Sequence, residues 1–305
     1  MPDYSALLDA EILAFIRKSE SFPPEGEGLE AERRAYDALC AAFRQDRPEG
    51  VSTEDRRIGQ VPVRVYEQGE PSCTVVYAHG GGFVKGGLES HDDICAEICN
   101  QTGYRVVAVD YRLAPEHAHP VAFDDCFAAV EWVEESFDLP IVLAGDSAGA
   151  TLMASVAHHA RGRLRNVIGQ VLIYPALGAD GTGASYRDHA EAPLLSAAAL
   201  MYYRGVRSGG VVPAGDATYS PLLDKDFDDL PRTVIFTAEC DPGASDGADY
   251  ARLLEAADVP VKLVHERGLV HGFLRARHMS ARADASFERI VLAIEALGQG
   301  LWVYE

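Results

Sequence analysis

The sequence predicts an α/β fold with a mostly parallel, doubly wound sheet, helices on both of its faces and a helical cap. Several strand-length runs are continuously apolar, which is typical of strands buried on both faces of a parallel sheet. From residue 73 onward these runs alternate with helical patterns, and such units form right-handed crossovers that cover both faces of a sheet. Residues 177–225 break the alternation, which predicts an insertion above the sheet as part of a lid.

The elements follow in order along the chain. Two amphipathic helical patterns come first, around residues 6–18 and 29–44, separated by the turn-rich segment SFPPEGEG. Strands are expected at residues 56–59, 61–67, 73–79, 104–111, 139–145, 166–175, 232–239 and 259–266. Helices are expected near residues 88–101, 121–136, 147–161, 245–257 and 280–298. The insertion contains Gly-rich turns and one helical pattern, PLLSAAALMYYRG.

Composition and charge exclude several classes of protein. The 305 residues have a formal net charge of −20, which argues against nucleic-acid binding. No uncharged apolar run approaches the ~18 residues of a membrane span, and acids within the first twenty residues favour an amphipathic helix over a signal peptide. The six cysteines show no CxxC spacing, and the two thiols of Cys95 and Cys99 make a poor zinc site. We therefore expect a cytoplasmic protein with reduced thiols, no metal and no membrane partner.

The segment GDSAG at residues 145–149 is a candidate nucleophile motif. It follows an apolar strand and begins a helical pattern, which is the strand–turn–helix setting of a nucleophile elbow. Glycines suit this sharp turn because a Cβ atom there would strike the neighbouring strand and helix. Ser147 would then lie at the carboxyl end of the strand and at a helix N-terminus, whose dipole favours developing negative charge. The alternative is that Ser147 only caps the helix.

A serine hydroxyl needs a base, and in this setting the base follows the serine in the chain. His271 is the best candidate, because it lies in the Gly-flanked loop GLVHGF just after the last expected strand. The other histidines after Ser147 lie in helices, in the insertion or within a strand: His158, His159, His189, His265 and His278.

The acid that orients the imidazole should follow the preceding strand. Asp241 is the first acid in the loop after residues 232–239, and it would set the tautomer and stabilise the imidazolium. Asp246 is better explained as an acid at a helix N-terminus. Glu239 is a third candidate, but it lies at the strand end, closer to the sheet.

The segment HGGGF at residues 79–83 is a candidate oxyanion loop. Its glycines let the backbone turn N–H groups toward a ligand without side-chain obstruction. We assign the oxyanion donors to Gly81, Gly82 and Ala148, the residue after the serine. A phosphate-binding loop is disfavoured, because the segment lacks the Lys-Ser/Thr of a P-loop and the GxGxxG of a dinucleotide site.

Five motifs in this order closely resemble the bacterial hormone-sensitive-lipase-like carboxylesterases, which have the α/β-hydrolase fold. They are HGGGF, YRLAPEHAHPVAFDD (111–125), GDSAG, DP (241–242) and HGF (271–273), and the resemblance covers about residues 60–300. It implies esterase activity without a cofactor, Ser147, Asp241 and His271 as the triad, and Gly81 and Gly82 in the oxyanion hole. We interpret YRLAPE as loop scaffolding below the site.

The resemblance also implies a lid made from an N-terminal helical segment and an insertion before the acid-bearing strand. We therefore divide the chain into the N-terminal part of the cap (1–50), the first part of the catalytic core (51–176), the cap insertion (177–225) and the second part of the core (226–305).

The expected function is serine carboxylesterase activity on a small ester through an acyl-enzyme. The Ala- and Gly-rich lid suggests a modest pocket and short acyl chains. Alternatives are an amidase or arylformamidase with the same triad, or a ligand-binding receptor of the kind known in plant members that lack the histidine. We consider a homodimer as the assembly.

Overall fold

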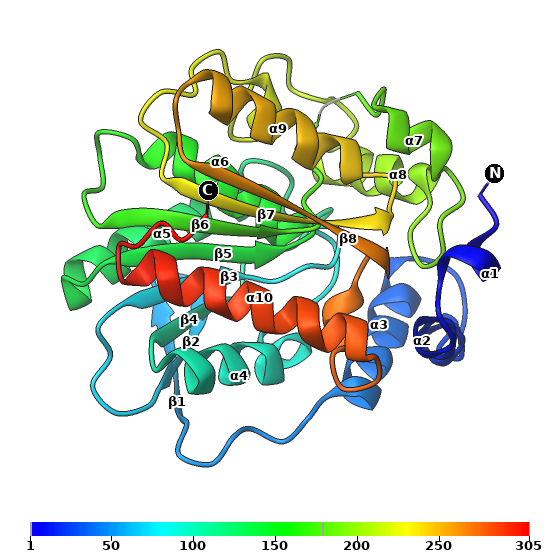
Figure 1. The fold of residues 1–305 in the computed structure, drawn as a ribbon, viewed down its shortest axis with the longest axis horizontal. Coiled ribbons are helices and arrows are strands. Elements are labelled where there is room, and N and C mark those ends of the chain that lie inside the picture. The colour runs from blue at the N-terminus through cyan, green and yellow to red at the C-terminus, as the bar shows by residue number, and fades with distance from the viewer. Residues whose placement is uncertain (1, 179, 305) are drawn as a thin grey trace.

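The computed structural model describes residues 2–178 and 180–304. One eight-stranded sheet runs through it in the order β1-β2-β4-β3-β5-β6-β7-β8 (Figure 1). The first two pairs in this order are antiparallel and the others are parallel, so the predicted mostly parallel sheet is confirmed. The strands are β1 (Ser52–Ile58), β2 (Val61–Glu67), β3 (Thr74–Ala78), β4 (Arg105–Val109), β5 (Ile141–Asp146), β6 (Val167–Ile173), β7 (Arg232–Cys240) and β8 (Val261–Val270).

Helices cover both faces of the sheet. Helices α4 and α10 pack on one face, and α5, α6 and α9 pack on the other, so that two separate hydrophobic cores lie against the strands. The helices are α1 (Tyr4–Leu7), α2 (Ala10–Glu20), α3 (Leu29–Phe43), α4 (Asp92–Thr102), α5 (Val121–Phe137), α6 (Ala148–Ala160), α7 (Ala184–Asp188), α8 (Ala197–Arg207), α9 (Ala244–Ala256) and α10 (Ala281–Gly298). Three short 3-10 turns complete the elements: η1 (Leu88–Ser90), η2 (Pro221–Leu223) and η3 (Phe273–Ala276).

Some element bounds differ from the sequence prediction. Strand β1 begins at Ser52, and its mostly exposed residues explain why no apolar pattern marked its start. The first helix is divided at extended Leu8, because the Asp9 carboxylate accepts the N–H groups of Glu11 and Ile12 and starts α2 there. Strand β8 continues to Val270, beyond the expected end at residue 266.

The two expected cap segments lie at the carboxyl ends of the parallel strands. Figure 1 shows α1, α2 and α3 together with α7 and α8 at the end toward which the β7 and β8 arrows point. Helix α2 buries Ile12 and Phe15 against the core formed with α10. The insertion contains α7 as well as the predicted helix α8, and none of its described residues is in a strand. The side chain of Ser196 accepts the N–H of Ala199 and so starts α8.

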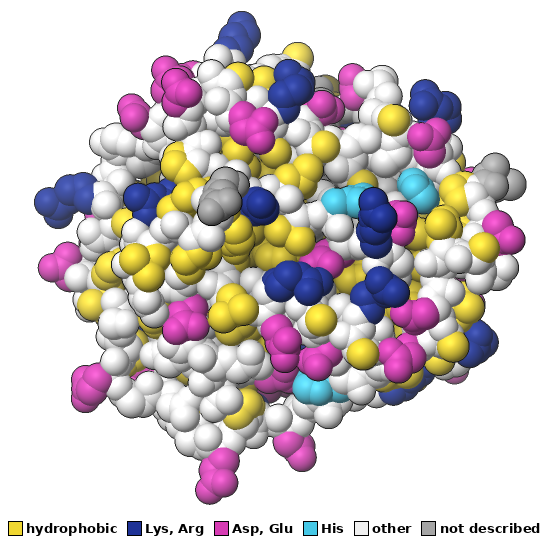
Figure 2. All heavy atoms as spheres, in the orientation of Figure 1, with side chains coloured by type: hydrophobic (Ala, Val, Ile, Leu, Met, Phe, Trp, Pro, Cys, Tyr) yellow, Lys and Arg dark blue, Asp and Glu magenta, His cyan; other side chains and the backbone are white. Residues whose placement is uncertain are grey.

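The face drawn in Figure 2 carries acidic and basic side chains in a mixed arrangement. Hydrophobic side chains gather there between α9 and α10, where the chain ends. Val303, in this C-terminal stretch, is 62% exposed, and β8 is the last strand of the sheet. Within the described part of the chain, every helix is too short or too polar to span a bilayer.

Candidate active site

Ser147 occupies a sharp turn between β5 and α6. Its φ of 52° and ψ of −118° form a conformation that side-chain-bearing residues rarely adopt. A Cβ atom on Gly149 would lie 1.9 Å from the carbonyl oxygen of Ala78, and one on Gly145 would lie 2.7 Å from the same atom. The predicted reason for both glycines is therefore confirmed. The Ser147 side chain makes no capping hydrogen bond to α6, so its hydroxyl is available to another partner.

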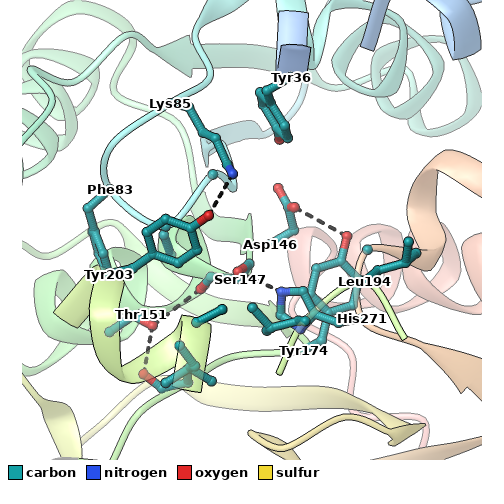
Figure 3. Close-up of a pocket in the computed structure, with 18 of the residues that line it drawn as sticks. Tyr36, Phe83, Lys85, Asp146, Ser147, Thr151, Tyr174, Leu194, Tyr203 and His271 are labelled. Carbon is teal, nitrogen blue, oxygen red and sulfur yellow. Dashed lines mark hydrogen bonds between the residues drawn. The ribbon is translucent and has the colours of Figure 1, made fainter. Parts of the chain in front are cut away.

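That partner is His271, which directly follows β8. Its Nε2 lies 2.8 Å from Ser147 Oγ (Figure 3). Its Nδ1 lies 2.7 Å from Asp241 Oδ2. Asp241 directly follows β7, is 1% exposed, and also accepts the N–H of Gly243 at 2.8 Å. The structure thus brings together a hydroxyl, an imidazole and a buried carboxylate in one hydrogen-bonded chain. In this arrangement the imidazole can take the hydroxyl proton while the carboxylate stabilises the resulting cation.

The other two candidate acids face different partners. The Asp246 carboxylate lies in the first turn of α9 and accepts the Gly178 N–H at 2.6 Å and the Tyr186 hydroxyl at 2.9 Å. Burial raises the pKa of Asp246 to about 6. Glu239 accepts the N–H of Gly268 at 2.7 Å and so braces β8. Neither carboxylate contacts His271 in the structure.

The remaining histidines after Ser147 have structural partners of their own. His158 lies between Asp224 and Tyr250, far along α6 from the serine. The other contacts are from His189 to Tyr4, His265 to Thr237 and His278 to Glu97. His265 and His278 are exposed.

The loop after β3 presents backbone N–H groups beside Ser147. Gly81, Gly82 and Ala148 all line the cavity around the serine, and their N–H groups donate to no oxygen of the described residues. Gly81 and Gly82 have φ values of 130° and 63°, which favour glycine. A Cβ on Gly81 would lie 2.0 Å from the Lys85 carbonyl oxygen, and one on Gly82 would lie 2.8 Å from the Tyr203 ring. A larger residue at either position would therefore displace the loop.

Sequence reasoning missed the role of Asp146, which lies beneath this loop. Its carboxylate accepts the Gly80 N–H and the Tyr77 hydroxyl, both at 2.9 Å, and the Tyr174 hydroxyl at 3.2 Å (Figure 3). It also lies 3.1 Å from His91 Nε2. Burial disfavours its charge, but His91 and the hydrogen bonds hold the pKa of Asp146 below its usual range. The only sequence signal for this supporting role was that an acid directly precedes Ser147 in the chain.

Tyr174 lies between Asp146 and the imidazole of His271 and contacts both. The Tyr174 ring packs against the His271 ring with a centroid distance of 4.8 Å. Asp146 therefore contacts both the start of the oxyanion loop and the residue that supports His271.

The YRLAPE segment supports the same loop from the other side, in line with its expected scaffolding role. The Tyr111 hydroxyl donates to the His79 carbonyl at 2.7 Å, and the two rings stack at 4.2 Å. The Ala114 N–H donates to the Phe83 carbonyl at 2.9 Å. These contacts hold both ends of the HGGGF segment.

A cavity of about 400 Å³ lies above Ser147. Its walls come from the core and from both expected cap segments, with Phe15 and Tyr36 from the N-terminal helices and Leu200 and Tyr203 from α8. Figure 3 shows Ser147 between Tyr36 on one side and Thr151 on the other. Among residues 2–178 and 180–304, no group of three or more His, Cys, Asp or Glu side chains is arranged to hold a metal ion.

Comparison with known proteins gives consistent similarities. The family described as the α/β hydrolase fold matches residues 75–275. The carboxylesterase NlhH of Mycobacterium tuberculosis is 37% identical over 268 residues, which cover 81% of this chain and 80% of the relative. The ethyl acetate hydrolase of Pseudomonas putida is 32% identical over 323 residues, which cover 96% and 99%. The solved structure of a hyperthermophilic esterase from Pyrobaculum calidifontis has a TM-score of 0.86 at 30% identity, covering 95% of this chain and 98% of that one.

Proposed function

On the premise that this chain belongs to the hormone-sensitive-lipase-like carboxylesterases, we propose that Ser147, His271 and Asp241 hydrolyse esters of short acyl chains. The family has the α/β-hydrolase fold, and the chain is a carboxylic ester hydrolase. The observation that supports this assignment most directly is the hydrogen-bonded chain from Ser147 through His271 to Asp241 at the floor of the cavity.

In the proposed first half-reaction, Ser147 Oγ attacks the ester carbonyl while His271 Nε2 accepts its proton. The N–H groups of Gly81, Gly82 and Ala148 donate to the carbonyl oxygen as it becomes negative. Asp241 accepts the Nδ1–H and stabilises the imidazolium. His271 then returns the proton to the leaving alkoxide, which departs as an alcohol and leaves an acyl-enzyme.

In the second half-reaction, water attacks the acyl-enzyme as His271 accepts one of its protons. The same N–H groups hold the second oxyanion. Collapse of this intermediate breaks the bond to Ser147 Oγ, which regains its proton from His271, and releases the carboxylic acid.

The cavity supports the preference for short chains. Its volume of about 400 Å³ is near the low end of small-molecule sites, and the Tyr203 ring lies directly against Gly82. Amides and formamides remain alternative substrates of the same triad, but esters are favoured because an alcohol leaves with less protonation than an amine. A binding-only receptor is disfavoured, because His271 is present and contacts the serine.

We further propose that residues 1–50 and 177–225 act together as the cap, flanking core segments 51–176 and 226–305. The lining of the cavity by α2, α3 and α8 supports this division.

Six buried free thiols support a cytoplasmic enzyme. The edge position of β8 and the exposure of Val303 support a homodimer, which light scattering after gel filtration would test.

An activity panel with wild type and Ser147→Ala tests the proposed function. Butyrate, octanoate and dodecanoate aryl esters test chain length, and a butyryl anilide tests amides. Ser147→Ala should lose essentially all hydrolysis yet unfold at nearly the same temperature, because the lost hydroxyl makes no capping bond. Residual activity above a few per cent in the folded variant would remove Ser147 from the mechanism.

A further inference from the structure

A cation in the wall of the catalytic cavity has no hydrogen-bond acceptor among the residues that the structure describes. Arg204, in the last turn of α8, lines the cavity and is only 7% exposed. Neither of its Nη groups has an acceptor among the described residues. Burying a guanidinium group without acceptors costs free energy that an anion bound at the site would recover.

Arg207, one turn further along the same helix, provides a contrast. It is also buried, but its Nη1 donates to the Tyr219 carbonyl at 2.8 Å and its Nη2 to the Thr218 carbonyl at 3.3 Å. Its guanidinium carbon lies 4.0 Å from the centre of the Phe83 ring. Arg207 therefore joins α8 to the following loop and covers the oxyanion loop, whereas the Arg204 side chain makes no hydrogen bond to that loop.

The protein's own groups do not neutralise Arg204 by direct contact. Among the described residues, no carboxylate forms an ion pair with Arg204. Burial raises the pKa of Asp246 to about 6, and the nearby charge of Arg204 offsets only part of this rise. The Asp246 carboxylate instead accepts hydrogen bonds from the Gly178 N–H and the Tyr186 hydroxyl. The end of α8 and the Tyr219 ring, 5.8 Å from the guanidinium carbon, both favour a cation, but they supply no hydrogen-bond acceptor to its N–H groups.

The cavity is basic within an acidic protein. The whole chain has a formal net charge of −20, yet the cavity wall has more cationic than anionic side chains. The charged lining residues are Lys85, Arg204, Arg207, Arg275, Glu20 and Asp146. Cations gathered in a low-dielectric cavity focus the electrostatic potential and favour an anionic ligand there.

We propose that Arg204 binds a carboxylate carried by the substrate, so that the preferred substrates are short esters that end in a carboxylate. This inference rests on the proposed ester hydrolysis at Ser147. A guanidinium group binds a carboxylate through two parallel hydrogen bonds, which Arg204 has free to offer. Both Nη groups are enclosed, so binding requires a change of side-chain rotamer, which no hydrogen bond to the described residues opposes.

Two matched pairs of substrates test the proposal and locate the charge within the ester. Monomethyl glutarate and methyl pentanoate differ by a carboxylate in place of a methyl group in the acyl part. The pair of 4-acetoxybutanoate and butyl acetate makes the same change in the alcohol part. Hydrolysis at pH 7.5 is followed by titration of the released acid, and kcat and KM are measured for each ester. In at least one pair, wild type should favour the charged ester by about tenfold or more in kcat/KM.

The variants separate a local anion site from a general effect of charge. Arg204→Met should lower kcat/KM for the favoured charged ester by a factor on the order of 30 to 100, mainly through KM, since hydrogen bonds to charged groups have about this effect. Its neutral match should change by less than about threefold, which also reports that the variant is folded. Arg187→Met, which removes an exposed cation from α7, should leave the hydrolysis of both esters unchanged. Arg204→Lys should recover part of the preference.

Several results would overturn the assignment. One is that wild type shows no preference for the charged ester in either pair. Another is that this preference is retained in Arg204→Met. If Lys85→Met abolished the preference and Arg204→Met did not, the anion would bind at Lys85 instead. Calorimetric titration of Ser147→Ala with monomethyl glutarate, with and without Arg204→Met, measures binding independently of turnover. If wild type hydrolysed no ester in the panel but Ser147→Ala bound monomethyl glutarate only when Arg204 was present, the proposed function would be refuted and the anion site would stand.

Discussion

Asp241 and Asp246 lie five positions apart, but their carboxylates bind different neighbours. Asp241 holds His271 Nδ1, whereas Asp246 uses a single oxygen, Oδ2, to accept both Gly178 and Tyr186. Asp241→Asn should lower kcat by a factor on the order of 10⁴, because asparagine favours the wrong imidazole tautomer. Asp246→Asn keeps one acceptor oxygen for both donors, so kcat should stay within about threefold and stability within about 1 kcal/mol.

The two aspartate variants control for each other. Each is checked by circular dichroism and thermal unfolding before kcat is measured with a short aryl ester. If Asp246→Asn were the inactive variant and Asp241→Asn the active one, the assignment of the triad acid would be wrong.

Asp146 is a positioning residue whose effect should appear in the transition state. Asparagine in its place turns an NH₂ group toward the Gly80 N–H or the tyrosine hydroxyls, and these donors then lose an acceptor. We expect Asp146→Asn to lower kcat by a factor on the order of 10 to 100 through the misplaced oxyanion loop, with KM little changed.

A boronic acid inhibitor tests this expectation for Asp146. Its adduct with Ser147 places an oxygen in the oxyanion hole, so its affinity should fall in parallel with kcat. A purely structural role predicts instead a lower unfolding temperature with unchanged kcat and boronate affinity in the folded enzyme.

At the scale of elements, α8 shapes the site through its position on the oxyanion loop. Tyr203 packs against Gly82, and its hydroxyl accepts the Lys85 ammonium at 2.8 Å. Tyr203→Ala should open space beside the reacting carbonyl and raise the kcat/KM ratio of octanoate to butyrate esters by about tenfold, since a methylene in an apolar pocket is worth about 1–3 kcal/mol.

The neighbouring Tyr202 provides the matched control for Tyr203. It is 52% exposed, so Tyr202→Ala removes the same side chain from the same helix without touching Gly82. The ratio should stay at the wild-type value in this variant. An unchanged ratio in Tyr203→Ala would show that another element limits chain length.

At the scale of the whole molecule, buried histidines should make the fold sensitive to acid. Burial lowers the pKa of His79 to about 3 and that of His158 to about 4, and it also lowers the pKa values of His91 and His119. In the unfolded chain these groups take up protons near pH 6.5, so the unfolded state binds more protons below that pH. The free energy of unfolding should therefore fall as pH decreases from about 6.5 to 5.

Urea unfolding at several pH values measures this dependence. Each such histidine contributes up to about 1.4 kcal/mol per pH unit, while Asp246, whose pKa burial raises to about 6, acts in the opposite direction. His158→Asn should flatten the slope relative to wild type. A stability that stayed constant or rose between pH 6.5 and 5 would contradict the expectation.

The sequence by itself determined the order of strands and helices and the positions of Ser147, Gly81, Gly82, Asp241 and His271 as site candidates. Each of these inferences depends on local information, namely an apolar run that ends at a turn with glycines, an acid or a histidine. Parallel strands then bring their carboxyl ends to one edge of the sheet, so residues distant in the chain converge there. Only the second half of β1 was predicted, because the exposed residues at the start of this edge strand form no apolar pattern.

Only the tertiary structure decided which groups surround these residues. Asp146 beneath Gly80, Tyr203 over Gly82 and the isolated guanidinium of Arg204 all depend on contacts between elements far apart in the sequence. No local pattern encodes such contacts, because they join residues that only the folded chain brings together. The candidate site residues could therefore be proposed from motifs, whereas the shape and charge of the cavity required the folded chain.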